Sequence, residues 1–234
     1  MDDFPLLSVT IFTPLAGALA IFLFVRGPED LVARNAKWGA LWVSLFTFGF
    51  SLLIWLNFKN ETADFQYAER QEWMPSFNIT YHVGVDGISM FFVLLSTLLT
   101  PICILASWDA IKTRVKEYMI AFLVLETMMV GMFCALDFIV FYIFFEAVLI
   151  PMFLIIGVWG GNRRVYAAFK FFLYTLLGSV LMLLALIAMY VQTGTTDIPA
   201  IMQHHFRYEV QLWMWLALFA SFAVKVPMWP VHTW

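Results

Sequence analysis

One uninterrupted apolar run, from Tyr118 to Trp159, limits what this chain can fold into more than any other feature. The run is 42 residues long, and as a single helix it would reach about 63 Å, roughly twice the hydrocarbon core of a bilayer. It therefore predicts two membrane-spanning helices, over residues 118–135 and 137–159. The break is expected at Asp137, a residue type that caps helix N-termini, and the tight turn makes the two helices neighbours.

Composition and further apolar runs place the rest of the chain in the same class. Hydrophobic residues make up 63% of the sequence and charged residues only 12%, which excludes a water-soluble globular domain. Apolar runs predict spans over residues 5–25, 38–58, 90–107 and 166–191, and a last span that starts near Gln211. We therefore expect an all-α polytopic membrane protein with about seven transmembrane helices.

Polar segments separate these runs. Residues 26–37 are expected to form a loop, because Gly27-Pro28 stops the first helix. Residues 59–85 form the longest polar stretch and predict an ordered loop outside the membrane, in which the alternating segment NITYHV predicts a short strand. The phrase GVDGIS, residues 84–89, predicts the turn that leads into the third span.

Glu146 is the carboxylate that lies deepest in an apolar segment, FYIFFEAVLIPMFLIIGVWGG. A charged side chain at the centre of a span costs about 2.5–3.5 kcal/mol on insertion scales, so an acid in this position is a functional candidate. Pro151, five residues later, cannot donate a hydrogen bond to Ala147 and should loosen the helix beside the acid. These two features favour a functional role for Glu146.

Lys225 is the expected partner of Glu146. It lies about fourteen residues into the last apolar run, where a lysine side chain cannot easily reach the headgroups. Pro227 and Pro230 cannot donate backbone hydrogen bonds, so the seventh helix should be broken at Lys225-Val226-Pro227. Freed carbonyls at membrane depth are tolerated where protein or water surrounds them, so the break predicts a hydrated ion path.

A lysine and a carboxylate that share an apolar environment are suited to proton transfer. Desolvation destabilises both charged forms and mutual attraction stabilises them, so a change in their separation loads or unloads a proton. The alternative is a static ion pair that links two helices, although a hydrophobic pair is often equally stable in that position.

Four further titratable residues lie in or near the predicted spans. Glu126, in the middle of a span, either bonds a neighbouring helix or belongs to a proton path. Lys170, near the start of the sixth span, either extends to the headgroups or belongs to that path. His232 follows the helix break and is a candidate proton relay, because histidine titrates near physiological pH. Asp137 is expected to be a helix cap or a solvated residue at the membrane interface.

The sequence predicts no metal, nucleotide or nucleophile site. His204 and His205 are adjacent residues in a polar loop, which makes them a poor pair of metal ligands. Cys103 and Cys134 lie in apolar runs without metal-ligand spacing, so neither a metal nor a disulfide is expected.

Basic residues predict the orientation in the membrane. The segments after the first, third and fifth spans hold eight of them, whereas those after the second, fourth and sixth hold three. Because cytoplasmic loops are enriched in Lys and Arg, the N-terminus is expected on the periplasmic side. Asp2 and Asp3 stand where a cleavable signal peptide needs basic residues, so the first helix is expected to be retained.

Three phrases together, GVDGIS, FFEAVLIPMFLIIGVWGG and FAVKVPMWPVHTW, resemble the antiporter-like chain M (subunit 4) family of respiratory complex I, the NADH:quinone oxidoreductase. Related pump subunits and multisubunit sodium/proton antiporters share the acid and the lysine in a broken helix, whereas the LIPM after Glu146 looks specific to chain M. The resemblance covers the whole chain. It implies that Glu146 is the essential glutamate of the fifth helix and that Lys225 is its partner in the seventh.

The resemblance also implies a setting for the chain. A member is an all-helical membrane-arm subunit of a proton-translocating enzyme, has no redox centre or cofactor of its own, and lies beside other antiporter-like subunits and membrane lipids. FMN and iron-sulfur clusters are implied in partner subunits, and no nucleic acid is implied. The expected location is a bacterial inner membrane, with the mitochondrial inner membrane as the alternative.

Family members are longer and carry a second, inverted repeat, so this chain is expected to be a fragment. Residues 1–115 are expected to form an N-terminal three-helix segment, and residues 116–234 an incomplete first repeat. Two other functions stay open. One is an independent cation/proton antiporter subunit, with sodium-dependent transport that needs no NADH; the other is a structural membrane-arm subunit whose charged pair only holds helices together.

Overall fold

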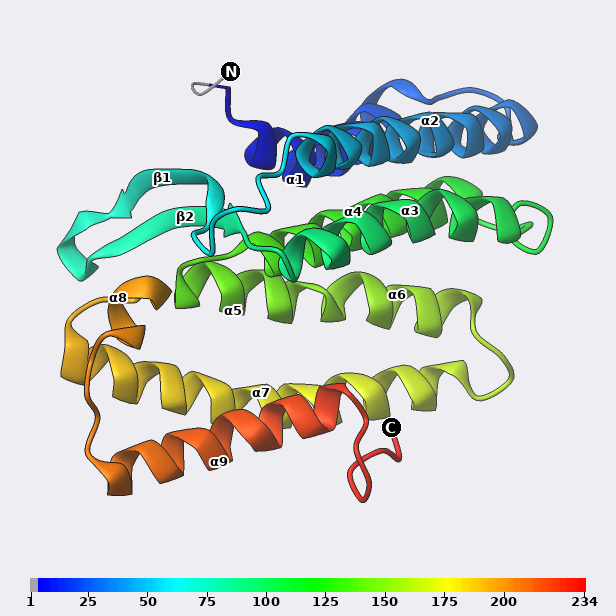
Figure 1. Ribbon diagram of the computed structural model, residues 1–234. Helices are drawn as coiled ribbons and strands as arrows, with labels where there is room; N and C mark the ends of the chain where they lie inside the picture. Colours follow the sequence, from blue (N-terminus) through cyan, green and yellow to red (C-terminus); the bar gives the residue numbers. More distant parts are fainter. Residues whose placement is uncertain (1–3) are drawn as a thin grey trace. The chain divides into compact units, whose positions relative to one another are not determined.

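The computed structural model describes residues 4–234, which form helices and one β-hairpin (Figure 1). Asp2 and Asp3, on which the expectation of a retained first helix rests, lie outside the described residues. Within the described part, six segments are long and apolar enough to cross a membrane: α1 (Leu6–Phe24), α2 (Glu29–Leu56), α3 (Ser89–Ala106), α4 (Val115–Cys134), the pair α5–α6 (Phe138–Trp159) and α7 (Arg164–Thr193). After the short α8 (Ile198–Met202), α9 (Tyr208–Lys225) is a seventh long helix, which confirms the predicted fold class.

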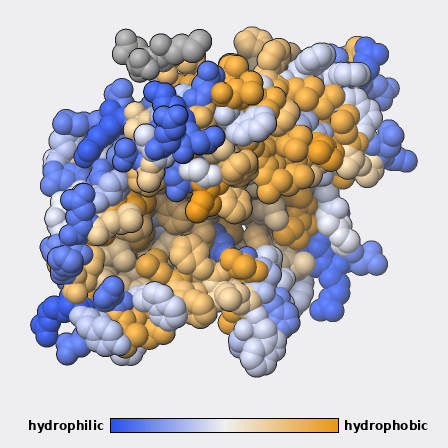
Figure 2. All heavy atoms as spheres, in the orientation of Figure 1, coloured by the Kyte–Doolittle hydropathy of each residue, from blue (hydrophilic) through white to orange (hydrophobic). Residues whose placement is uncertain are grey.

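The helices expose apolar side chains, as expected of helices that face lipid or other membrane helices. In the most apolar 18-residue stretch of α5–α6, only 28% is buried, and Ile150 of this segment is 61% exposed. On the face drawn in Figure 2, hydrophobic residues cover the helices and hydrophilic residues gather near helix ends and at the hairpin.

Contacts divide the chain into two compact units. One unit contains the chain up to Glu69 together with Val83–Ala135, and in it α1 packs against α2 and α4, while α3 packs against α2 and α4. The other contains Arg70–His82 and Leu136–Trp234, and in it α7 packs against α6 and α9. The expected boundary between a three-helix segment and a repeat at residue 115 stays a prediction.

The second span begins earlier than expected, because the predicted loop over residues 26–37 is helical from Glu29 onward. Pro28 stands just before the first helical residue, where its missing N–H costs no hydrogen bond. Glu29 and Asp30 lie in the first turn, where the helix dipole favours negative charge. These local signals start α2 in a polar segment, before the chain becomes apolar.

The polar stretch between α2 and α3 contains a two-stranded sheet of β1 (Gln66–Met74) and β2 (Ile79–Val85). β2 confirms the strand predicted at NITYHV. A 3₁₀ turn (Pro75–Phe77) and Asn78, which adopts the left-handed conformation with φ 51°, connect the strands. β1 was not predicted, because most of its residues are exposed and its sequence QYAERQEWM therefore lacks apolar alternation.

Asp86 starts the third span at the predicted turn. Its Oδ1 accepts hydrogen bonds from the N–H groups of Ser89 (2.7 Å) and Ile88 (3.1 Å), and Ser89 Oγ accepts one from the Asp86 N–H (2.9 Å). This is a reciprocal capping arrangement. Partial burial raises the pKa of Asp86, but the hydrogen bonds from Ser89 and Ile88 outweigh burial and hold the pKa below its usual value.

Asp137 caps α5 (Phe138–Ala147), as predicted. Its Oδ1 accepts hydrogen bonds from the N–H groups of Ile139 (2.8 Å) and Val140 (3.3 Å). Asp137 is nevertheless completely buried, so the alternative of a solvated interfacial residue is wrong.

The helix expected over 137–159 is interrupted beside Glu146. α5 ends at Ala147, and α6 (Leu149–Trp159) follows after the single residue Val148. Pro151 lies four residues after Ala147 and has no N–H to donate to its carbonyl, which accounts for the interruption. Val148 keeps helical dihedral angles, so the two helices follow each other as one span.

Candidate functional site

The structure brings Glu146 and Lys225 together, although 79 positions separate them in the sequence. Glu146 is in the last turn of α5, and Lys225 is the last residue of α9. The Nζ of Lys225 lies 3.6 Å from Oε1 of Glu146, and the two side chains are only 16% and 17% exposed. Both charges therefore sit at helix interruptions inside the same compact unit.

The ammonium group of Lys225 is held mainly by Phe145. Nζ donates a hydrogen bond to the Phe145 carbonyl (2.9 Å) and lies 3.8 Å from the centre of its ring. Carbonyls in the last turn of a helix lack helical partners, so this one is open to a side chain. The aromatic face adds a cation–π attraction. Lys225 can therefore stay bound whether or not Glu146 is charged.

The carboxylate of Glu146 is less constrained. Among residues 4–234, neither of its oxygens has a hydrogen-bond partner, and both oxygens are buried. The 3.6 Å separation from Lys225 is too long for a hydrogen bond, although it is short enough for an ion pair. Both oxygens therefore keep lone pairs that are open to a further hydrogen-bond donor.

Backbone carbonyls at the end of α9 were expected to lack hydrogen-bond partners, but two of them have protein partners. The helix stops at Lys225, as predicted from Pro227 and Pro230. The carbonyl of Ala223, however, accepts a hydrogen bond from the Met228 N–H (2.8 Å), because the chain turns back after the helix. The carbonyl of Val224 accepts one from Nε1 of Trp234 (2.7 Å). These two carbonyls are satisfied by protein and do not themselves require water.

The other candidates occupy different surroundings. Glu126, in α4, is completely buried, and neither of its oxygens has a hydrogen-bond partner in the part of the chain that the structure describes. Lys170, in α7, donates a hydrogen bond to the carbonyl of Thr233, so a protein group, in the segment after α9, binds its ammonium. His232 follows α9 and is exposed.

Sequence reasoning missed a buried polar cluster at the other end of α5. Nδ1 of His82 lies 2.9 Å from Oδ2 of Asp197, and Nη2 of Arg70 lies 3.5 Å from the same oxygen. Thr196 Oγ1 donates a hydrogen bond to Oδ2 of Asp137 (2.5 Å). Asp197 before Ile198-Pro199 is a recognisable helix start, but its contact with His82, 115 positions away, leaves no signal in the sequence.

Gly178 allows α7 and α9 to approach closely. A Cβ atom at this position would lie 3.0 Å from Cβ of Val224 and 3.1 Å from its Cγ1. Val224 directly precedes Lys225, so the close approach fixes the helix end that carries the lysine. We expect Gly178→Ala to lower the free energy of unfolding by about 1–3 kcal/mol, because a branched side chain next to its backbone cannot move aside. Thermal unfolding in detergent measures this effect.

Gly157→Ala is a matched control for this substitution. A Cβ atom at Gly157 would lie 3.5 Å from Cβ of Ala168, which is an ordinary contact. This variant should be neutral or slightly stabilised, because Ala favours a helix by about 1 kcal/mol relative to Gly. Equal stability of the two variants would contradict the close approach at Gly178.

Two family models match the chain. Residues 18–136 match the amino terminus of NADH-ubiquinone oxidoreductase chain 4, and residues 135–234 match the membrane region shared by NADH:quinone oxidoreductase and Mrp antiporters. Among the relatives, subunit M of NADH-quinone oxidoreductase from Rhodobacter capsulatus is 52% identical over 98% of this chain and 47% of its own length. Chain 4 of NADH-ubiquinone oxidoreductase from Marchantia polymorpha is 50% identical over 97% of this chain and 46% of its own length.

Solved structures show the same fold. A chain of respiratory complex I from Thermus thermophilus superposes with a TM-score of 0.85 at 25% identity, over 97% of this chain and 45% of that chain. A chain of the Mrp complex from a Dietzia species superposes with a TM-score of 0.82 at 18% identity, over 97% of this chain and 24% of that chain. The chain thus spans about half the length of the relatives that it matches.

Proposed function

Since the chain belongs to the family of NADH-ubiquinone oxidoreductase chain 4, we propose that it forms part of a proton-translocating subunit in the membrane arm of an NADH:quinone oxidoreductase. One observation carries the proposal: Lys225 Nζ lies 3.6 Å from Glu146 Oε1, and both side chains are largely buried at helix interruptions. Glu146 modulates the charge of Lys225, and Lys225 passes protons onward. Oxidation of NADH and reduction of quinone take place in other subunits, which hold the FMN and iron-sulfur clusters.

The electrostatics of the pair support this role. Two unit charges about 4 Å apart attract each other by about 4 kcal/mol at an effective dielectric constant of about 20. Protonation of Glu146 removes this stabilisation from the charged lysine. The Phe145 carbonyl and ring then remain as its partners, and the ammonium group can release its proton without leaving the site. The proton moves and no electron does, so the chain needs no redox centre for this step.

Three residues are proposed as further groups on the proton path. Glu126 has the strongest support, because a fully buried carboxylate without a hydrogen-bond partner in the described chain is unstable when ionised. Lys170 and His232 lie in the same compact unit as the Glu146/Lys225 pair. Asp137 is assigned the cap of α5 and no transfer step.

We also propose a location and partners. The six apolar segments and the bacterial relative support a bacterial inner membrane, and the distribution of basic residues supports a periplasmic N-terminus. The exposed apolar faces of the helices would contact lipids and neighbouring antiporter-like subunits. An independent cation/proton antiporter is the second candidate, because an Mrp chain has the same fold.

Replacing Glu146 and Lys225 together by apolar residues tests the proposal against a static ion pair. A buried ion pair is often replaced by a hydrophobic pair without loss of stability, so Glu146→Leu with Lys225→Met should assemble. We expect NADH-driven proton uptake into membrane vesicles to be lost in this double variant. Retained proton uptake would overturn the proton relay, and sodium-dependent transport without NADH would favour the antiporter instead.

A further inference from the structure

The buried cluster around Asp197 connects three segments that are far apart in the sequence. Asp197 and Asp137 form an antiparallel β-bridge, in which the Phe138 N–H donates to the Thr196 carbonyl (2.8 Å) and the Ile198 N–H donates to the Leu136 carbonyl (2.9 Å). This bridge attaches the start of α5 to the loop that follows α7.

The β-hairpin closes the same cluster from another side. The His82 carbonyl accepts a hydrogen bond from the Leu136 N–H (2.8 Å), and Nδ1 of His82 bonds Oδ2 of Asp197 (2.9 Å). Because a carboxylate can only accept, His82 donates from Nδ1. The Thr80 N–H adds a long contact to Oδ2 of Asp137 (3.4 Å).

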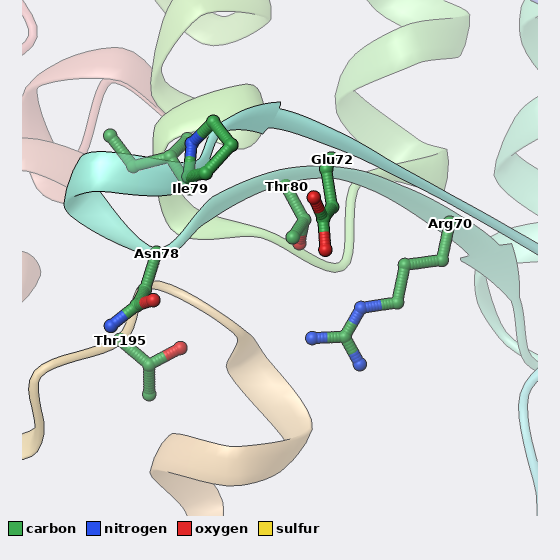
Figure 3. Close-up of a pocket in the computed structure, with 7 residues that line it drawn as sticks. Arg70, Glu72, Asn78, Ile79, Thr80 and Thr195 are labelled. Carbon is green, nitrogen blue, oxygen red and sulfur yellow. The ribbon is translucent and has the colours of Figure 1, made fainter.

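Burial distinguishes the contacts of Asp197. The side chains of His82 and Asp197 are 12% and 7% exposed, whereas that of Arg70 is 60% exposed. A cavity of about 390 Å³, lined by Arg70, Thr80 and Thr195 among others, opens beside the cluster (Figure 3). The Arg70 ion pair faces this open space and contributes little. The buried contact with His82 therefore contributes more than the Arg70 ion pair to holding the Asp197 side chain in place.

The cluster lies at the start of α5, the helix that carries Glu146. Lys225 is held to α7 through the close approach of Val224 to Gly178. Glu146 sits in α5, whose start is held to the loop after α7 by the bridge and by the hydrogen bond from Thr196 to Asp137. A shift of the start of α5 is carried along the helix to Glu146, because a short helix moves as a rigid body.

We propose that His82 and Asp197 are positioning residues for the Glu146/Lys225 pair: they hold the capped start of α5 against the loop after α7 and so set the separation between the two charges. The proposal rests on the proposed function of that pair. Asp197 also accepts a hydrogen bond from the Ala200 N–H (3.0 Å), which caps α8 and keeps the carboxylate oriented toward His82.

The test measures NADH-driven proton uptake per assembled complex, from about pH 6 to pH 9, in vesicles that carry His82→Ala or His82→Asn. We expect His82→Ala to lower uptake about tenfold and to displace its pH profile, because a misplaced pair changes both rate and protonation. His82→Asn should restore the profile and most of the rate, since its amide nitrogen is attached to Cγ as Nδ1 is. His205→Ala, an exposed histidine outside the cluster, is the matched control.

Two further variants keep the outcome decisive. If His82→Ala does not assemble, Thr196→Val removes only the hydrogen bond to Asp137, and Thr196→Ser retains it. An unchanged rate and pH profile in His82→Ala, or in Thr196→Val where His82→Ala does not assemble, beside loss of uptake in Glu146→Gln, would overturn the positioning role alone. Normal uptake in Glu146→Gln would instead remove Glu146 from the proposed function, on which this positioning role rests.

Discussion

Glu146→Gln is expected to reduce NADH-driven proton uptake to less than about a hundredth while the complex still assembles. Glutamine has nearly the same shape but cannot carry the negative charge that faces Lys225 at 3.6 Å. The lysine keeps its hydrogen bond to Phe145, so the local structure should survive. Uptake into membrane vesicles and the amount of assembled complex measure the two parts of this prediction, and quinone reduction that is coupled to uptake should fall with it.

Glu209→Gln is the matched control, because Glu209 is a glutamate in α9 whose side chain is 78% exposed. This variant should pump normally. Proton uptake in Glu146→Asp should lie between the values of these two variants, since aspartate keeps the negative charge but its side chain is one methylene shorter. Full proton uptake in Glu146→Gln would assign Glu146 a structural role and leave Lys225 to carry the proposal alone.

Lys225→Arg is expected to lower pumping to below about a tenth of the normal rate. Arginine keeps the positive charge and can keep the ion pair, but it stays protonated in proteins and cannot release a proton. A static ion pair would tolerate this substitution, whereas a proton relay would not. Proton uptake per assembled complex therefore distinguishes the two roles directly.

Lys225→Met completes the comparison, because methionine has a similar length and no charge. Under the proton-relay mechanism both variants assemble and neither pumps. If Lys225→Arg pumps normally while Lys225→Met does not, the lysine acts as a fixed charge, and the proton passes elsewhere.

Span positions were predictable because each depends on a single segment. The free energies of transfer of individual residues into a membrane add up along a segment. Hydropathy therefore located α3, α4 and α7 within a few residues. The start of α2 was missed because a polar helix end carries no hydropathy signal, although Pro28 and Glu29 marked it. β1 was missed for a related reason, since a strand exposed on both faces has no apolar alternation.

The Glu146/Lys225 pair was predictable from the sequence, but the buried cluster around Asp197 was not. Glu146 and Lys225 were identified because a charge in an apolar segment is costly, and the prolines marked both helix interruptions. His82 and Asp197 gave no such signal, because polar residues in a polar loop are ordinary. Their role became visible only when the hairpin and the loop after α7 met at the start of α5.

The sequence by itself determined that this protein lies in a membrane, where its helices run, and which two charges need an explanation. These properties follow from the free energy of transferring a segment into the membrane, which depends only on the residues of that segment. The tertiary structure alone decided that the charges lie 3.6 Å apart, that Phe145 holds the lysine, and that Asp137 is buried. Such contacts depend on how distant helices pack, and packing is a property of the whole chain rather than of any segment.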